Sequence, residues 1–310
     1  MANPRLVEFT TKDGLELPGF LFGTKKPDEA AIFLHGNGSS SVFYHQESKK
    51  PLAEALNKKG IALLYFNNRG AHYTKKLSQT HGKKVVRKKY GMAYEKIKEC
   101  IFDIDGAIDF LKKQGYKKFY LIGSSTGANK ICVYNWYSQL IAKRSNYYKP
   151  ENPVSKYILL GPGDDTGFYY DLLGREKFWK LLNKAKDKIK KRQGGEIISE
   201  LLAHDLIFSY QGFYDIANPD GDYNVFPFSE VVKKLKLSKK KLFRHFKSIK
   251  KPTFVIFGSE DEFAWGDVLR CVEIMKKYQP DLSYEIIPGA NHGFSEHREE
   301  VAGVIVKFLV

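Results

Sequence analysis

Residues 118–128 read KFYLIGSSTGA, an apolar run followed by a Gly-x-Ser-x-Gly turn and the start of a predicted helix. A strand that turns sharply into a helix leaves little room for Cβ atoms, and Gly123 and Gly127 provide that room. The residue at the tip is Ser125, whose hydroxyl would lie at the amino end of the helix, where an oxyanion is favoured. The pattern predicts a nucleophilic serine if a base and an acid follow elsewhere in the chain.

The composition indicates a globular chain. The sequence has 310 residues, 43% of them hydrophobic, which suits one large α/β domain with an insertion, or two smaller domains. No apolar run of about twenty residues occurs, so we expect no membrane span. The first residues lack the apolar run of a secretory signal, and three sparse cysteines indicate reduced, buried thiols. These features predict a cytoplasmic protein.

The chain is strongly basic, with a net charge of +16, but only nine of its 51 basic residues are arginines. Arginine favours specific recognition of bases and phosphates, so a lysine-rich surface indicates diffuse charge. No helix-turn-helix, zinc-finger or RNA-binding signature occurs. The dense lysine runs 184–192 and 233–251 are predicted to be solvated helix faces. We expect no nucleic-acid partner, and a nucleic-acid-associated protein is kept as an outside alternative.

Strands and helices alternate along most of the sequence. Residues 6–10 and 15–22 alternate in polarity around Asp13-Gly14 and predict an antiparallel hairpin. Later strands are apolar throughout, which is typical of parallel strands covered on both faces. Besides the strand before Ser125, these are residues 30–34, 61–66, 157–163, 253–258 and 283–288. Helices are predicted from Pro51 to Gly60, Tyr94 to Leu111, Ala128 to Ala142 and Glu296 to Leu309, and residues 71–92 are predicted to be a loop.

One segment interrupts this alternation. Between residues 164 and 251 the pattern is helical and rich in aromatic residues and lysine, with no core strand. We predict an α/β core formed by residues 1–163 and 252–310, with residues 164–251 inserted as a helical cap over the carboxyl edge of the sheet. No Gly-x-Gly-x-x-Gly follows a strand, which argues against a second, nucleotide-binding domain.

The predicted base for Ser125 is His292. It lies just after the last predicted strand, in the sequence PGANHGF, between glycines that let the loop turn the ring inward. His297 is the reserve candidate. His35 is expected to bond the loop backbone, and the remaining histidines lie in predicted helices or polar loops and are expected to be non-catalytic: His45, His72, His81, His204 and His245.

The imidazole needs a carboxylate that fixes its tautomer and stabilises its cation. Asp261 follows an apolar strand, three residues after the glycine that ends it, and is the predicted acid. Its neighbours Glu260 and Glu262 could instead cap a helix or be solvated. Asp164 and Asp165, after the preceding core strand, are the alternative acids.

The oxyanion of the reaction needs hydrogen-bond donors. The sequence His35-Gly36-Asn37-Gly38 follows the strand 30–34 and leaves free amides where the loop would cross the serine turn. We predict the backbone N–H groups of Asn37 and Thr126 as the two donors. Removing one such donor typically costs about 2.7–4 kcal/mol of transition-state stabilisation.

Ser125, Asp261 and His292, in this chain order and with the His35-Gly36 loop, resemble the α/β-hydrolase superfamily. The resemblance covers the chain outside the cap. It implies the α/β-hydrolase fold, with a mostly parallel sheet, an N-terminal antiparallel hairpin and helices on both faces. The chain is also similar to a family that includes siderophore-ester hydrolases, over residues 90–109, the serine turn, residues 261–263 and residues 289–292. One departure concerns Arg69, because many superfamily members carry an acid two residues before this arginine and this chain has Asn67.

These residues predict a two-step serine hydrolase that cleaves small-molecule carboxylic esters through an acyl-enzyme, without a metal or cofactor. Short-to-medium acyl esters are the first expectation for the substrate. An amidase or peptidase, and a siderophore-ester hydrolase, are the alternatives on the same fold. A non-catalytic binding protein is a further alternative, but its expected sign, a missing triad residue, is absent.

Overall fold

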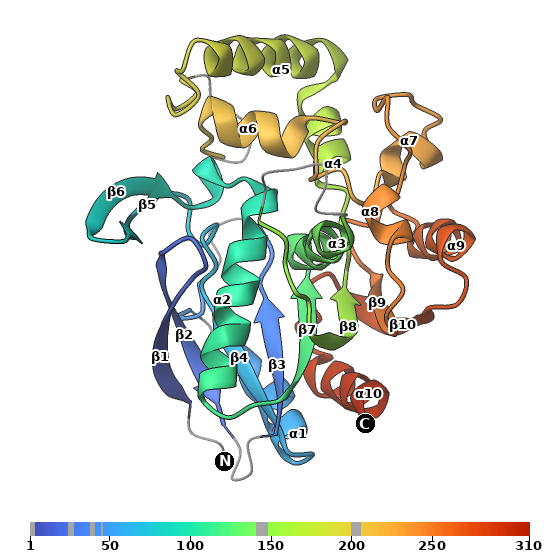
Figure 1. The fold of residues 1–310 in the computed structure, drawn as a ribbon. Coiled ribbons are helices and arrows are strands. Elements are labelled where there is room, and N and C mark those ends of the chain that lie inside the picture. Colours follow the sequence, from blue (N-terminus) through green and yellow to red (C-terminus); the bar gives the residue numbers. More distant parts are fainter. Residues whose placement is uncertain (1–3, 24–27, 38–40, 45, 141–147, 200–205) are drawn as a thin grey trace.

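The computed structural model describes residues 4–23, 28–37, 41–44, 46–140, 148–199 and 206–310. A central sheet has the strand order β1-β2-β4-β3-β7-β8-β9-β10 (Figure 1). β1 (Arg5–Thr10) and β2 (Glu16–Phe22) form the expected antiparallel hairpin, and β2 pairs antiparallel with β4 (Ile61–Phe66). The other neighbours pair in parallel: β3 (Glu29–Leu34), β7 (Lys118–Ser124), β8 (Val154–Leu160), β9 (Thr253–Glu260) and β10 (Ser283–Asn291). The predicted fold class is confirmed.

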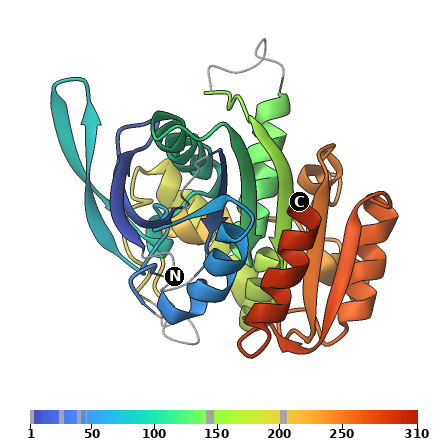
Figure 2. The same cartoon turned by 90° about the horizontal axis from the view of Figure 1, so that it is seen from below.

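Helices cover both faces of this sheet, as Figure 2 shows. α1 (Lys50–Asn57) and α10 (Arg298–Leu309) pack together on one face. The opposite face carries α2 (Cys100–Lys113), α3 (Thr126–Gln139) and α9 (Val268–Tyr278). Every residue of β4 is buried, as expected for a strand that is covered on both sides. In the described part of the chain, no helix is long and apolar enough to cross a membrane.

The segment 164–251 is helical and adds no strand to the central sheet within its described residues. Figure 1 shows its first helices above the carboxyl ends of β3, β7 and β8. Many of its aromatic side chains form the core of the segment itself, for example Tyr169, whose ring contacts the ring of Phe208 edge to face at 5.4 Å. The helices are α4 (Asp165–Leu173), α5 (Arg175–Lys190), α6 (Tyr210–Ala217), α7 (Phe228–Val232) and α8 (Arg244–Lys247).

The prediction of a loop over residues 71–92 is wrong. β5 (Lys75–His81) and β6 (Lys84–Tyr90) form a second antiparallel hairpin, whose turn contains Gly82 with φ +59°. Most of its side chains are exposed, because the hairpin projects from the body of the protein (Figure 1). Two exposed strands have no need of apolar alternation, so the sequence lacked the usual strand signal.

The helix predicted from Tyr94 begins only at Cys100. Two 3-10 turns precede it, η2 (Met92–Tyr94) and η3 (Ile97–Glu99). The backbone N–H of Ile97 donates to Asp215 at 2.8 Å, and the carbonyl of Ala93 accepts the N–H of Ser209 at 2.8 Å. Bonds to the segment 164–251 therefore hold these residues out of the helix, although their apolar spacing is helical.

Two further boundaries differ from the predictions. α5 covers most of the lysine run 184–192, as expected, but in the run 233–251 only α8 is helical. The residue before α8, Phe243, has a left-handed backbone with φ +54° and a fully buried side chain, so the chain turns there to dock its apolar residues. α3 ends at Gln139, whereas Ala142, like His45 and His204, lies outside the described residues.

Arg69 is buried in an ion-pair cluster that its neighbouring sequence did not predict. Its guanidinium contacts Asp103 at 2.7 Å, Asp13 at 2.8 Å and Glu99 at 3.0 Å. These acids come from the first hairpin, η3 and α2, which are distant in sequence from Asn67. The missing local acid is therefore compensated by three carboxylates from other elements.

Candidate active site

Ser125 lies between β7 and α3 with φ +55° and ψ −127°, a conformation that L-residues rarely adopt. The crossing of the backbone around it explains the two glycines of the motif. A Cβ atom on Gly123 would lie 2.3 Å from the carbonyl oxygen of Gly127, and one on Gly127 would lie 2.1 Å from that of Leu34. The serine is thus fixed at the amino end of α3 by backbone packing, as the sequence predicted.

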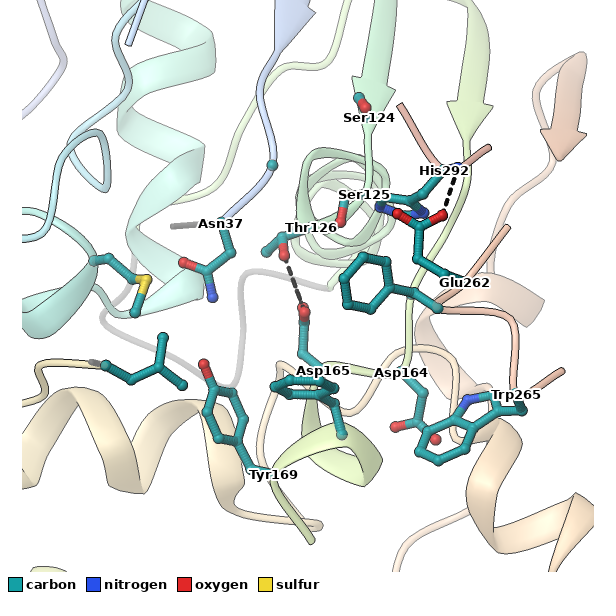
Figure 3. Close-up of a pocket in the computed structure, with 16 residues that line it drawn as sticks. Asn37, Ser124, Ser125, Thr126, Asp164, Asp165, Tyr169, Glu262, Trp265 and His292 are labelled. Atoms are coloured by element: carbon teal, nitrogen blue, oxygen red, sulfur yellow. Dashed lines mark hydrogen bonds between the residues drawn. The ribbon is translucent and has the colours of Figure 1, made fainter. Parts of the chain in front are cut away.

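His292 and Asp261 are brought together at the ends of β10 and β9. Nδ1 of His292 donates to Oδ1 of Asp261 at 2.8 Å, and the Asp261 side chain is almost fully buried. A proton on Nδ1 leaves Nε2 as the basic nitrogen of the neutral ring. In Figure 3 the ring of His292 lies beside the side chain of Ser125. The three predicted residues therefore converge at the carboxyl edge of the sheet.

Gly161, directly after β8, contacts this pair, and the sequence prediction missed it. It has φ +50°, and a Cβ atom there would lie 3.1 Å from Oδ2 of Asp261 and 3.1 Å from Nδ1 of His292. Any side chain at this position would press on the acid and the imidazole. The available signal was the sequence Gly161-Pro162-Gly163 immediately after a core strand.

Glu262 and Phe263 were also not predicted as site residues. The backbone N–H of His292 donates to Oε2 of Glu262 at 3.0 Å, which Figure 3 marks by a dashed line. The ring of Phe263 meets the imidazole edge to face, with centroids 4.8 Å apart. Both residues follow Asp261 directly, so one short turn after β9 contacts His292 on several sides.

The predicted oxyanion donors, Asn37 and Thr126, line the same pocket as Ser125. Thr126 is the first residue of α3, and the first N–H groups of a helix have no acceptor within it. The loop that carries Asn37 is tied down by His35, whose Nδ1 donates to the carbonyl of Gly36 at 2.8 Å and whose Nε2 accepts the N–H of Asn68 at 3.2 Å. Burial, assisted by the charge of Lys130, lowers the pKa of His35 to about 3, so this ring is neutral and structural.

The alternative acids do not pair with His292. Asp164 caps α4 by accepting the N–H of Gly167 at 2.7 Å, and burial raises its pKa to about 6. Asp165 accepts the hydroxyl of Thr126 and the amide of Asn129, each at 3.0 Å. Burial raises the pKa of Asp165 to about 7. The sequence marked both aspartates as acids near the site, but the structure places them in its opposite wall.

The pocket in front of Ser125 has a volume of about 540 Å³ and is formed by both parts of the chain (Figure 3). Its lining combines aromatic rings with carboxylates. The core contributes Asn37, Ser125, Thr126, Glu262, Phe263 and His292, and the segment 164–251 contributes Asp164, Asp165, Phe168 and Tyr169.

The remaining described histidines and the cysteines lie elsewhere. His297 precedes α10 and does not line the pocket, and His245 is fully buried with Nε2 3.1 Å from Asp222. The thiols are free and buried, as predicted: Cys100, Cys132 and Cys271. Within the described ranges, no group of three or more His, Cys, Asp or Glu side chains is placed to hold a metal ion.

The sheet order, the strained serine turn and the loops that meet above it define the fold of an α/β-hydrolase. The sequence profile of one family, described as a protein of unknown function (DUF1749), matches residues 89–309. This match spans most of the sequence, and the chain belongs to that family. No curated protein matches the sequence.

Solved structures with the same fold include several esterases. The Pyrococcus furiosus esterase Pf2001 is 18% identical, with 99% of this chain and 90% of that chain covered and a TM-score of 0.57. Est1E from Butyrivibrio proteoclasticus, solved with ferulic acid bound, is 17% identical, with 97% of each chain covered and a TM-score of 0.59. The carboxylesterase CesB from Bacillus subtilis is 16% identical, with 99% of this chain and 92% of that chain covered and a TM-score of 0.52. At these identities the likeness shows the shared fold.

Proposed function

We propose that this protein is a serine hydrolase that cleaves small-molecule carboxylic esters, with Ser125 as nucleophile, His292 as base and Asp261 as the acid that orients the base. The observation that carries the proposal is the 2.8 Å bond from His292 Nδ1 to the buried Asp261, beside a serine held in a strained turn. Such strain is retained where it positions a functional group. No cofactor enters the proposed reaction.

In the first step His292 Nε2 accepts the proton of the Ser125 hydroxyl as Oγ attacks the ester carbonyl. Asp261 stabilises the imidazolium, and the oxyanion accepts the backbone N–H groups of Asn37 and Thr126. The intermediate collapses to an acyl-enzyme, and the leaving alcohol takes the proton from His292. Water then attacks the acyl-enzyme with His292 again as base, which releases the carboxylic acid and restores Ser125.

The segment 164–251 acts in this proposal as a cap that selects the substrate. Phe168 and Tyr169 present aromatic surface to the pocket from α4, opposite Ser125. Mostly apolar pockets with a few placed polar groups bind the body of a small ligand. The esterase names of Pf2001, Est1E and CesB favour esters over amides, and short-to-medium acyl or aryl groups are the acids that we expect.

A panel of nitrophenyl esters of graded acyl length, each with its matched amide, tests this function. We expect turnover of the esters by the wild type, weaker or no turnover of the amides, and loss of ester turnover in Ser125→Ala. Retention of ester hydrolysis by Ser125→Ala would contradict the mechanism. Faster turnover of the amides than of the esters would instead identify an amidase on the same residues.

A further inference from the structure

A second cavity, of about 260 Å³, lies behind the candidate active site on the face of the sheet that α1 and α10 cover. Gly36 and Ser124 line both this cavity and the pocket of Ser125, so the two spaces lie on either side of the serine turn and its loop. Much of the lining is apolar, and an engineered apolar cavity of about 150 Å³ already binds benzene. The apolar lining includes Leu52, Leu63, Val301, Ala302 and Ile305.

The described lining of this cavity includes two charged residues, and both are cations. Lys49 immediately precedes α1, and Arg298 is the first residue of α10. The described lining includes no aspartate or glutamate. The amino end of α10 adds a partial positive charge on the same side. One side of the cavity is therefore positive, whereas the side chains that α10 contributes beyond Arg298 are apolar.

We infer that this cavity binds a small apolar monocarboxylate, with its carboxylate between Lys49 and Arg298 and its hydrocarbon body against α10 and β4. The charges select the carboxylate, because an anion is attracted directly to both cations, whereas a neutral alcohol of equal length is not. The apolar lining selects the body, because an inorganic anion would leave it unfilled. A bound acid would also contact Gly36 of the loop and Gly293, the residue after His292.

The ionisation of Lys49 provides an independent signature. Burial, and then the charge of Arg298, lower the pKa of Lys49 to about 8. Across the cavity, His35 after β3 is neutral and burial raises the pKa of Tyr65 on β4, so neither titrates near pH 8. On the segment of Lys49 itself, Glu47 and Lys50 are exposed and pair with each other. Loss of the Lys49 proton should therefore weaken carboxylate binding as the pH rises through about 8.

Isothermal titration calorimetry with hexanoate, 1-hexanol and sulfate tests the site on the full chain. We expect hexanoate to bind the wild type at pH 7 at least tenfold more tightly than 1-hexanol or sulfate. The double variant Lys49→Gln/Arg298→Gln should bind hexanoate at least tenfold more weakly. The control Lys50→Gln/Lys307→Gln, which removes two exposed lysines and the same net charge, should stay within twofold of the wild type.

Two further variants fix the location of the ligand. Ala302→Leu fills the apolar end from α10 and should weaken hexanoate binding without changing any charge, and Lys49→Arg should keep binding but lose the pH dependence near 8. Equal loss in the two double variants, equal binding of hexanoate and 1-hexanol, or unchanged binding by Ala302→Leu would overturn the inference. So would the absence of saturable hexanoate binding. None of these readouts depends on turnover at Ser125, so the test stands apart from the proposed esterase function.

Discussion

The two walls of the candidate active site are built in different ways. The sheet edge fixes its residues by backbone crossings: a Cβ atom on Gly127 would lie 2.1 Å from the oxygen of Leu34, and one on Gly258 would lie 2.1 Å from that of Ala290. The opposite wall is a helix, α4, which presents its side chains to the pocket. Backbone crossings tolerate no substitution, whereas a helix surface can change its side chains. We infer that the sheet edge determines the chemistry and that the helix wall determines the choice of substrate.

The largest expected effect comes from the acid of the sheet edge. Asp261→Asn should lower kcat by about 10⁴, because the amide cannot keep the correct tautomer of His292 or stabilise its cation. The exposed Asp281→Asn is the matched control and should retain wild-type activity. Steady-state kinetics on a nitrophenyl ester measure both. Near-normal activity in Asp261→Asn would contradict the claim that the sheet edge determines the chemistry.

Gly161→Ala tests whether crowding of the sheet edge matters for the reaction. The added methyl group must displace the carboxylate of Asp261 or the imidazole of His292, and φ +50° is strained for alanine. A displacement of about 1 Å can cost about 10²-fold in rate, so we expect kcat to fall by about 10- to 100-fold. Gly303→Ala on α10, where a Cβ atom meets open space, should leave kcat unchanged. Equal kcat values for the two variants would show that a side chain at position 161 does not disturb Asp261 and His292.

Asp165→Asn tests how a buried carboxyl group in the α4 wall affects the free energy of unfolding. The folded protein holds a proton on Asp165 up to a pKa of about 7, whereas the unfolded chain releases it near the ordinary value of 3.8. The free energy of unfolding of the wild type must therefore fall between about pH 4 and pH 7 from this group, and the penalty persists above pH 7. Asp165→Asn lacks this penalty. We expect its stability relative to the wild type to rise by on the order of 4 kcal/mol between pH 4 and pH 8.

Urea unfolding at the two pH values measures this difference, with the exposed Asp281→Asn as the control. Activity then distinguishes the two walls of the site. Because Asp165 lies in the α4 wall, Asp165→Asn should keep kcat within about tenfold of the wild type at pH 7. A 10⁴-fold loss, as predicted for Asp261→Asn, would place Asp165 in the reaction itself.

The smallest expected effect lies where the two walls meet. Phe168 of α4 and Phe263 of the sheet edge contact each other edge to face, with ring centroids 6.0 Å apart. Aromatic pairs contribute about 0.5–1.5 kcal/mol beyond buried area, so a double-mutant cycle to alanine should give a coupling of that size in kcat/KM for aryl esters. Both single variants should change acetyl esters less than aryl esters. Strictly additive effects would show that the walls act independently.

The sequence predicted the sheet edge well because each of its features has a local cause. The apolar runs mark covered strands, and the glycines around Ser125, Asp261 and His292 mark sharp turns at their ends. Gly161 was missed because its role depends on a contact with two loops that lie far away in sequence.

The cap wall and the surface were predicted less well because long-range contacts decide them. Bonds from Asp215 and the Ser209 backbone hold residues before α2 out of the helix that their spacing indicates. The hairpin of β5 and β6 carries almost no apolar signal, since it is exposed on both faces. The carboxylates around Arg69 come from three separate elements, which no local pattern can reveal.

Covalent labelling with a fluorophosphonate tests the central claim most directly, because the probe reacts only with a serine that a base activates. We predict stoichiometric labelling of the wild type, located at Ser125 by peptide mass spectrometry, and no labelling of Ser125→Ala. Ser124→Ala, which removes the neighbouring hydroxyl, should still be labelled. An unlabelled wild-type protein, or equal labelling of wild type and Ser125→Ala, would contradict the assignment of Ser125 as the nucleophile.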